Sequence, residues 1–352
     1  MQLEPYKGKH EMNRLLIAFC TILISACGMQ VVNKPVSTEE DTQDFIEESE
    51  EETESDTDSE SEEVDQEDPA EEDVQEDPAE EDPEPIDFFQ LGSYEVLIES
   101  QSASVTNCPN MDYAVYYPEG ISNPPVVVLG HGFARGSSVM TGWAEHLSSW
   151  GVEVLLPTLC HYNVFTGVDH EMNGQNMKEL ASLRGALEVI YVGHSAGGLA
   201  AIIAASQDDN AIGVLGLDTT DTQDVPGVAD FIGRDYAGGV MAPAFSLRGE
   251  PSSCNSNNNG LDLFRMMGDY KAVKINSADH CDFENPTDFI CELNCESEST
   301  EFADEEISSV IITLSTAAVM SISGMSEYGT SVWSTEGLEE WLDLGIIQDF
   351  EQ

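Results

Sequence analysis

A strand, a glycine-rich turn and a helix follow one another directly in the middle of this chain. Residues 189–192 are β-branched or aromatic, the turn reads Gly193-His-Ser195-Ala-Gly197, and small apolar residues at helical spacing begin at Gly198. A bare Gly-x-Ser-x-Gly motif is weak evidence, because it also arises by chance. Between a strand and a helix it is typical of a nucleophile elbow, in which the serine stands in a strained turn. We therefore predict that Ser195 is a nucleophile; the alternative is an ordinary glycine-rich loop.

One histidine late in the chain is placed to activate this serine. A serine hydroxyl is a poor nucleophile until a base removes its proton, and a carboxylate must fix the tautomer of that base. His280 follows the apolar-alternating run 272–275, which indicates a late strand. In enzymes with a nucleophile elbow the base follows the last core strand. His280 is thus the predicted base, and a purely structural histidine is the alternative.

Two carboxylates at strand ends compete for the role of the acid. Asp218 ends the apolar run 214–217, and Glu250 follows the predicted strand 242–247. Both lie where the carboxyl ends of parallel strands build binding and catalytic sites. Asp218 leads because it stands directly at a strand end, whereas Glu250 lies beside Arg248 and could simply pair with it. The nearby competitors are Asp221 and Asp224.

An early strand is followed by a loop suited to an oxyanion hole. Residues 125–129 read Pro-Val-Val-Val-Leu, and the loop continues as Gly130-His-Gly132-Phe133. Acyl transfer needs two backbone N–H groups aimed at the developing oxyanion. We predict that Phe133 supplies one N–H group and that Ala196, the residue after the nucleophile, supplies the other.

In this order, the motifs of the chain resemble those of an α/β-hydrolase. The segments that carry the resemblance are Gly130–Phe133, Gly193–Gly198, Leu217–Asp218 and Asp279–His280. Within that superfamily the chain is most similar to the group of chlorophyllase-like proteins and platelet-activating-factor acetylhydrolases, over about residues 93–350. The resemblance implies ester hydrolysis without choosing the ester, and it favours Asp218, because the acid of those relatives follows the strand after the nucleophile helix. Many other α/β-hydrolases carry their acid in the loop that corresponds to residues 250–254. This chain has Glu250 there and no aspartate before Asp262.

Strands and helices alternate through the rest of this region. The predicted strands are residues 114–117, 125–129, 152–156, 189–192, 212–217, 242–247 and 272–275. The predicted helices are residues 139–150, 172–187, 198–206, 262–267, 301–321 and 335–344. Such alternation indicates an α/β class with a mainly parallel central sheet and helices on both faces. The uncharged stretch 308–324 is short and rich in Ser and Thr, so we expect a buried core helix there and not a membrane span.

The first 27 residues have the form of an export signal. Arg14 precedes an apolar run, and residues 24–27 (Ile-Ser-Ala-Cys) resemble a bacterial lipobox in which Cys27 would be lipidated. The start is either Met1 or Met12. We therefore expect an exported protein that is lipid-anchored to a bacterial membrane, the outer membrane or cell surface, and not to span it.

An acidic segment separates this leader from the region of alternating strands and helices. Residues 39–87 hold 28 acidic and no basic residues, and a nonapeptide at residues 66–74 recurs almost unchanged at 75–83. Such a segment buries too little apolar surface to offset its ordering entropy. The predicted organisation is a signal peptide (1–27), a disordered linker (28–87) and a catalytic domain (88–352). The net charge of −56 makes nucleic acid an unsuitable partner.

Six of the eight cysteines fall within the predicted catalytic domain, namely Cys108, Cys160, Cys254, Cys281, Cys291 and Cys295. An even number in an exported chain fits up to three disulfides, for which fifteen pairings are possible. The rival interpretation is a zinc site formed by Cys281, Cys291, Cys295 and His280, but the spacing lacks a Cys-x-x-Cys pair. We expect neither a metal nor a cofactor.

Together these patterns predict an exported serine hydrolase, and the resemblance implies that its substrates are carboxylic esters. We expect it to act as a monomer on a small or lipid-like substrate. The alternative is a tethered surface binding protein with this fold but without catalysis. No residue identifies the ester, although aromatic and histidine side chains beside the strand ends are candidates for the pocket lining. These candidates are Phe133, Trp143, His161, Tyr162 and Phe165.

Overall fold

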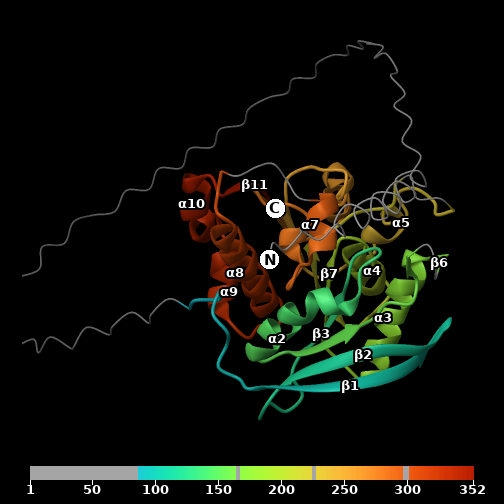
Figure 1. Cartoon of the computed structure of the whole chain (residues 1–352). Helices are drawn as coiled ribbons and strands as arrows, with labels where there is room; N and C mark the ends of the chain where they lie inside the picture. Colours follow the sequence, from blue (N-terminus) through green and yellow to red (C-terminus); the bar gives the residue numbers. More distant parts are fainter. Residues whose placement is uncertain (1–85, 164–166, 224–226, 296–300) are drawn as a thin grey trace, which may run out of the picture. The chain divides into compact units, whose positions relative to one another are not determined.

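The computed structural model of the chain describes residues 86–163, 167–223, 227–295 and 301–352. These residues form one large mixed sheet with helices around it, together with a two-stranded ribbon (Figure 1). Cys27 and Asp224 lie outside the described residues, as do Phe165 and all but the end of the predicted linker.

The elements follow one another in the alternating order that the sequence predicts. The strands are β1 (Val96–Val105), β2 (Cys108–Pro118), β3 (Val126–Gly130), β4 (Glu153–Pro157), β5 (Tyr162–Asn163), β6 (Gly167–Val168), β7 (Val189–His194), β8 (Ala211–Leu217), β9 (Ala244–Arg248), β10 (Tyr270–Ile275) and β11 (Ile347–Glu351). The α-helices are α2 (Thr141–Ser149), α3 (His170–Arg184), α4 (Ala196–Ala205), α5 (Arg234–Ala237), α6 (Leu261–Phe264), α7 (Phe289–Cys295), α8 (Asp304–Ile322), α9 (Glu327–Val332) and α10 (Thr335–Leu344). Short 3₁₀ turns are η1 (Ser137–Met140), η2 (Ser256–Asn258) and η3 (Cys281–Phe283).

The large sheet has nine strands in the order β1-β2-β4-β3-β7-β8-β9-β10-β11. Its six central strands, β4 to β10 in that order, run parallel. Antiparallel pairs close both edges, β1 with β2 and β10 with β11. Parallel neighbours need crossover connections, and the helices between the strands supply them. The predicted α/β class with a mainly parallel sheet is confirmed.

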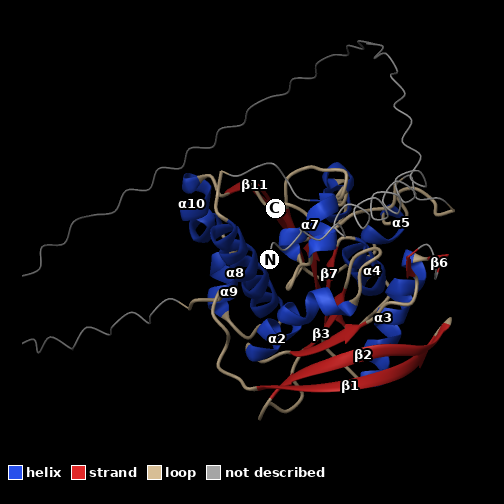
Figure 2. Cartoon of the chain, viewed as in Figure 1, coloured by secondary structure: helices blue, strands red, loops and turns tan. Residues whose placement is uncertain are grey.

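Alternate residues of the central strands face two separate hydrophobic layers. Val127 and Leu129 of β3 belong to a cluster with α2 and α8, whereas Val126 and Val128 belong to a cluster with α3 and α4. Because side chains alternate between the faces of a strand, helices must cover both faces of the sheet (Figure 2). Strands buried on both faces read as continuous apolar runs, which is why residues 126–129 could be recognised from the sequence.

The edges of the sheet differ most from the sequence prediction. β1 and β11 were not predicted, because their side chains are largely exposed and polar. A buried apolar face is what gives a strand its pattern. Helix α3 ends at Arg184, three residues earlier than predicted, because Gly185 adopts a left-handed φ of 76° and closes the helix.

Helix α8 is the one helix among the described residues that is long and apolar enough to cross a bilayer. In the structure it packs on β8, β9 and β10, and Ile311 and Leu314 are completely buried there. Its apolar character therefore accounts for its place in the core, as the sequence analysis expected.

Truncation of this buried helix face should destabilise the fold. We expect Leu314→Ala to lower the free energy of unfolding by about 2–5 kcal/mol, because it removes buried methyl groups and leaves a cavity. Leu344→Ala is the control, since Leu344 ends α10 with 58% of its surface exposed and should change stability by about 0.5 kcal/mol or less. Urea unfolding of both variants measures the difference, and equal effects would contradict this packing.

Candidate active site

Three predicted site residues lie together at the carboxyl ends of the parallel strands. Ser195 directly follows β7, Asp218 directly follows β8, and His280 lies in the loop after β10. These strands are parallel members of one sheet, so their carboxyl ends lie at the same end of the sheet. The parallel arrangement brings together residues that are far apart in the sequence.

The turn at Ser195 is strained and held by close backbone packing. Ser195 has φ 56° and ψ −125°, which a residue with a side chain adopts only under constraint. A Cβ on Gly193 would lie 2.2 Å from the carbonyl oxygen of Gly197, and one on Gly197 would lie 2.5 Å from that of Gly130. The N–H of Ser195 donates to the Leu217 carbonyl at 3.0 Å. The glycines therefore let three backbone segments meet beneath the serine.

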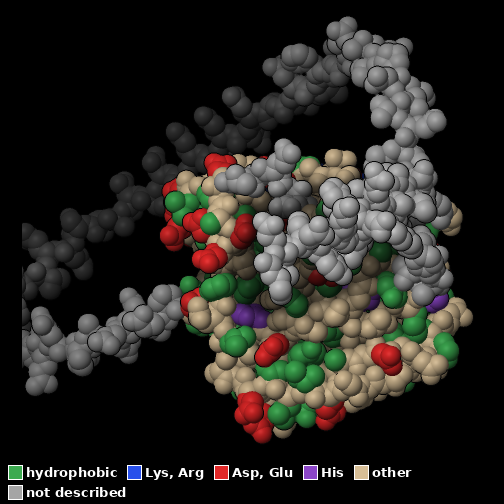
Figure 3. Space-filling view, viewed as in Figure 1, with side chains coloured by type: hydrophobic (Ala, Val, Ile, Leu, Met, Phe, Trp, Pro, Cys, Tyr) green, Lys and Arg blue, Asp and Glu red, His purple; other side chains and the backbone are tan. Residues whose placement is uncertain are grey.

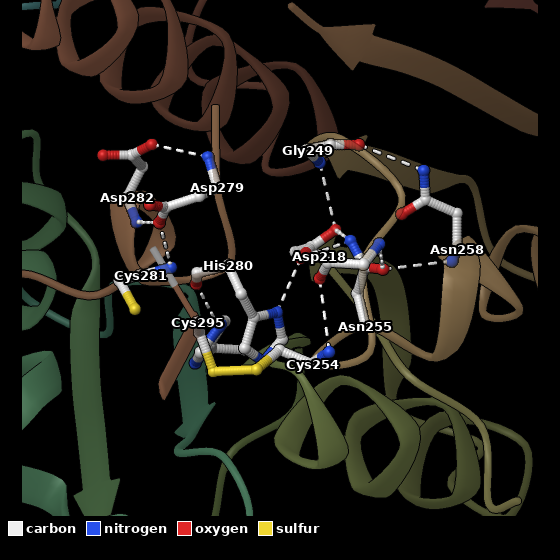
Figure 4. Close-up of polar contacts among 12 residues, drawn as sticks. Asp218, Gly249, Cys254, Asn255, Asn258, Asp279, His280, Cys281, Asp282 and Cys295 are labelled. Atoms are coloured by element: carbon white, nitrogen blue, oxygen red, sulfur yellow. Dashed lines mark hydrogen bonds and ion pairs between the residues drawn. A yellow bond between two sulfur atoms is a disulfide. The ribbon is translucent and has the colours of Figure 1, made fainter. Parts of the chain in front are cut away.

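Asp218 and His280 form the central hydrogen bond of the site. Nδ1 of His280 lies 2.6 Å from Oδ2 of Asp218, and the carboxylate is only 1% exposed (Figure 4). Because an ionised carboxylate only accepts hydrogen bonds, Nδ1 carries a proton, and in the neutral imidazole Nε2 then keeps its lone pair. The arrangement leaves Nε2 of His280 free to accept a proton.

The buried carboxylate of Asp218 receives further hydrogen bonds. The N–H of Gly249 donates to Oδ1 at 3.0 Å, and the side-chain amide of Asn255 lies 3.3 and 3.1 Å from the two carboxylate oxygens. Asn255 is itself completely buried, and its Oδ1 accepts from the N–H groups of Ser252 and Asn258. Asn255 was not predicted from the sequence; the asparagine-rich run 255–259 is the signal that marks its position.

His194, the residue before the serine, holds the loop that carries His280. Its Nε2 donates to the His280 carbonyl at 2.9 Å, and the two imidazole rings lie 4.5 Å apart. Complete burial holds the pKa of His194 well below its ordinary value, so this ring stays neutral. The Ser195 hydroxyl makes no hydrogen bond to His280 among the described residues. Catalytic hydrogen bonds are often long in the free enzyme and tighten when substrate binds.

The loop after β3 lies against the elbow and offers unpaired N–H groups. A Cβ on Gly132 would lie 3.2 Å from Cβ of Ser195, a tight contact, so glycine eases the close approach of this loop to the serine. In the described part of the chain, the N–H groups of Phe133 and Ala196 donate to no other group. They are free to bind an oxyanion beside the serine.

A buried histidine fixes the shape of this loop. His131 Nε2 accepts from the N–H of Leu159 at 3.0 Å, so the proton is on Nδ1, which donates to the Gly132 carbonyl at 3.0 Å. Burial lowers the pKa of His131 to about 4, which keeps the ring neutral and its two hydrogen bonds in place at neutral pH.

The competing carboxylates bind other partners. Glu250 lies 3.1 Å from the ammonium of Lys274, and this lysine takes the place of Arg248, which the sequence offered as one possible partner. Arg248 instead faces Asp349 and Glu351 at the sheet edge. Asp221 accepts the N–H groups of Thr222 and Gly233, which orders the loop after β8. Of these carboxylates, only Asp218 makes a hydrogen bond to His280.

The six cysteines of the described residues form three disulfides. The pairs are Cys108–Cys160, Cys254–Cys295 and Cys281–Cys291, with Cα–Cα distances of 6.0, 5.7 and 5.7 Å. Two pairs join α7 to the site, one at the residue after His280 and the other at the residue before Asn255. The sulfur atoms of Cys281, Cys291 and Cys295 lie within 4.8 Å of one another, but each is bonded to another sulfur.

The side chains predicted as candidates for the pocket lining lie in different surroundings, some exposed and some buried. Phe133 is 41% exposed at the site, whereas Trp143 is buried and donates through its indole N–H to the Phe283 carbonyl at 3.0 Å. The Tyr162 ring packs edge-on against His131 at 5.2 Å. Trp143 thus supports the loop after His280 from within the core. A cavity of about 690 Å³ lies away from this site, beside Arg184 near the amino ends of β3 and β4.

No protein-family model and no curated protein matches this chain. Its chemistry must therefore be inferred from the site itself. A strained serine, a histidine hydrogen-bonded to a buried carboxylate and two free N–H groups together suit nucleophilic attack on a carbonyl carbon.

The carboxyl of Asp282 should make stability depend on pH. Burial raises its pKa to about 7, and the neighbouring carboxylates of Asp279, Asp304 and Asp218 act in the same direction. Between pH 3.8 and 7 the unfolded chain loses this proton while the folded chain keeps it, so the group reduces stability as pH rises. Asp282→Asn keeps an acceptor for the Asp279 N–H but cannot ionise. In urea unfolding, we expect the stability of this variant relative to the wild type to increase as pH rises from 5 to 8. A difference in stability that does not change with pH would contradict the raised pKa of Asp282.

Proposed function

We propose that this chain is an exported serine hydrolase with an α/β-hydrolase fold that cleaves carboxylic esters. The observation that carries the proposal is the 2.6 Å hydrogen bond between His280 and buried Asp218. It lies at the carboxyl ends of the parallel strands, where Ser195 has its strained backbone conformation. The order serine, acid, histidine along the chain and the oxyanion loop upstream of the elbow support the same fold. A structural role for this histidine would not explain the two free N–H groups beside the serine.

The proposed reaction follows from these positions. Nε2 of His280 takes the hydroxyl proton as Oγ of Ser195 bonds to the ester carbonyl carbon. The N–H groups of Phe133 and Ala196 bind the oxyanion, and Asp218 stabilises the imidazolium. The imidazolium then gives its proton to the departing alcohol, which leaves an acyl-serine. Water, deprotonated by the same imidazole, releases the acid and restores the serine.

The setting of the domain supports an extracellular role. Three disulfides suit an oxidising compartment, which agrees with the proposed export signal and lipidation at Cys27. The acidic segment would then hold the domain away from the membrane surface as a spacer, because like charges extend a linker.

The charge distribution bears on the partners. All eight Lys and Arg residues of the described ranges make an ion pair or a hydrogen bond. Acidic side chains are spread over the face drawn in Figure 3. Phosphate recognition needs available cations, so we propose a neutral ester, small or lipid-like, as the substrate of a monomer and no nucleic-acid partner.

Hydrolysis of p-nitrophenyl esters by the full chain tests the proposal. We expect turnover across a panel of rising acyl length, and Ser195→Ala should lower kcat by about 10⁴-fold or more, because it removes the nucleophile. Ser331→Ala is the control, because the Ser331 hydroxyl donates to the Tyr328 carbonyl within α9. Absence of turnover with every ester in the folded protein would favour the alternative, a surface binding protein without catalysis.

The role of the acid can be tested separately. Asp218→Asn should lower kcat by about 10⁴-fold, because an amide no longer fixes the tautomer of His280 or stabilises its charged form. Glu250→Gln should leave kcat near that of the wild type, since Glu250 pairs with Lys274. The reverse result would transfer the role to Glu250.

A further inference from the structure

One buried ion pair joins the segments that flank the oxyanion loop and the base. Arg135 comes directly after the loop 130–134, and Glu284 directly after η3, which begins next to His280. Nε and Nη2 of Arg135 lie 2.7 Å from Oε1 and 2.7 Å from Oε2 of Glu284, a two-pronged geometry. The Glu284 side chain is fully buried and that of Arg135 is 12% exposed. A pair of this geometry fixes both distance and orientation, because the guanidinium is a planar fork.

The same carboxylate also lies beside the elbow. Oε1 of Glu284 is 3.8 Å from Nδ1 of His194, whose other nitrogen donates to the His280 carbonyl. On the opposite side, the N–H of Arg135 donates to the Gly132 carbonyl at 3.3 Å. The oxyanion loop (residues 130–134), the turn at Ser195 and the loop that carries His280 therefore meet around one buried carboxylate.

The charge state of the pair suits a permanent contact. Burial alone would lower the pKa of Arg135, but hydrogen bonds and attraction from Glu284 and Asp288 raise it above its ordinary value. The guanidinium thus stays charged at every pH at which the protein is folded. A second ion pair, 2.9 Å from Arg135 Nη2 to Oδ1 of Asp288, ties the arginine to the residue before α7.

We propose that Arg135 and Glu284 are positioning residues that hold the oxyanion loop at a fixed distance from His280, an inference that rests on the proposed hydrolase function. Neither side chain takes part in a bond change. They act through the Gly132–Phe133 backbone and the His280 backbone. The relative position of these two segments decides whether a bound ester can meet the oxyanion N–H groups while the Ser195 hydroxyl meets Nε2 of His280. A displacement of about 1 Å at such a site can reduce the rate by about 10²-fold.

Arg135→Lys is the variant that separates positioning from folding. Lysine keeps a positive charge beside buried Glu284, so the carboxylate is not left unpaired, but it cannot bind both oxygens in a fixed fork. The matched control is Arg184→Lys, because Arg184 pairs with Glu153 at 2.6 and 2.7 Å in the same geometry. Glu153 begins β4, so this pair lies at the opposite end of the parallel strands.

The readouts are kcat and KM for p-nitrophenyl acetate, with thermal unfolding of each variant. We expect kcat to fall by about 10²-fold for Arg135→Lys with KM near that of the wild type, and to stay unchanged for Arg184→Lys. Glu284→Gln, which leaves Arg135 paired with Asp288, should lower kcat in the same way. Equal kcat for Arg135→Lys and the wild type, or equal losses for both lysine variants, would overturn the proposal.

Hydrogen exchange keeps this inference separate from the proposed function. In Arg135→Lys, amides of residues 130–135 and 280–288 should exchange faster than in Arg184→Lys, because the contact between the two segments is weakened. If the wild type hydrolyses no ester, the hydrolase proposal fails, and unchanged exchange in both segments would then overturn the positioning role as well. Faster exchange without any hydrolysis would retain the contact as a structural clamp and overturn its role in catalysis.

Discussion

The buried carboxylate of Asp218 is the group on which the arrangement of this site depends. A carboxylate that is 1% exposed must be fully hydrogen-bonded, because an unpaired buried charge is very costly. Its partners come from two loops: Gly249 and Asn255 lie in the loop after β9, and His280 lies in the loop after β10. Satisfying one charge therefore brings the loops of three neighbouring strands together and gives His280 its tautomer.

The sheet and the disulfides make this convergence rigid. The parallel strands, buried on both faces, fix the points from which the loops leave. Helix α7 is then bonded through Cys291 to the base loop and through Cys295 to the loop that carries Asn255. The histidine and the support of its acid are thus linked to one short helix, so neither loop can move far without the other. Preorganisation of this kind is what efficient proton transfer requires.

The sequence predicts those parts of the site that depend on local signals. Ser195 and Asp218 each directly follow an apolar strand and His280 follows one within a few residues, so their positions could be read from the strand pattern alone. The central strands could be recognised for the same reason. The edge strands β1 and β11 could not, because exposed polar side chains hide their period.

The supporting residues depend on contacts between distant segments, and local patterns do not encode these. Arg135 and Glu284 are 149 positions apart, and Asn255 and Asp218 are 37 apart. Likewise the sequence offered Arg248 as a possible partner of Glu250. In the structure Lys274, which is opposite Arg248 in the parallel register of β9 and β10, pairs with Glu250 instead. Disulfide pairing was open among fifteen possibilities, and only the fold selects one.

The central claim is that Ser195 is activated by the pair of His280 and Asp218. Intact-mass and peptide mass spectrometry after treatment with a fluorophosphonate tests it most directly, because these reagents bond covalently to activated serines. The account predicts one adduct per chain, located on Ser195, and almost none in the folded His280→Ala variant. A folded wild-type protein that stays unlabelled, or one labelled equally well without His280, would contradict it.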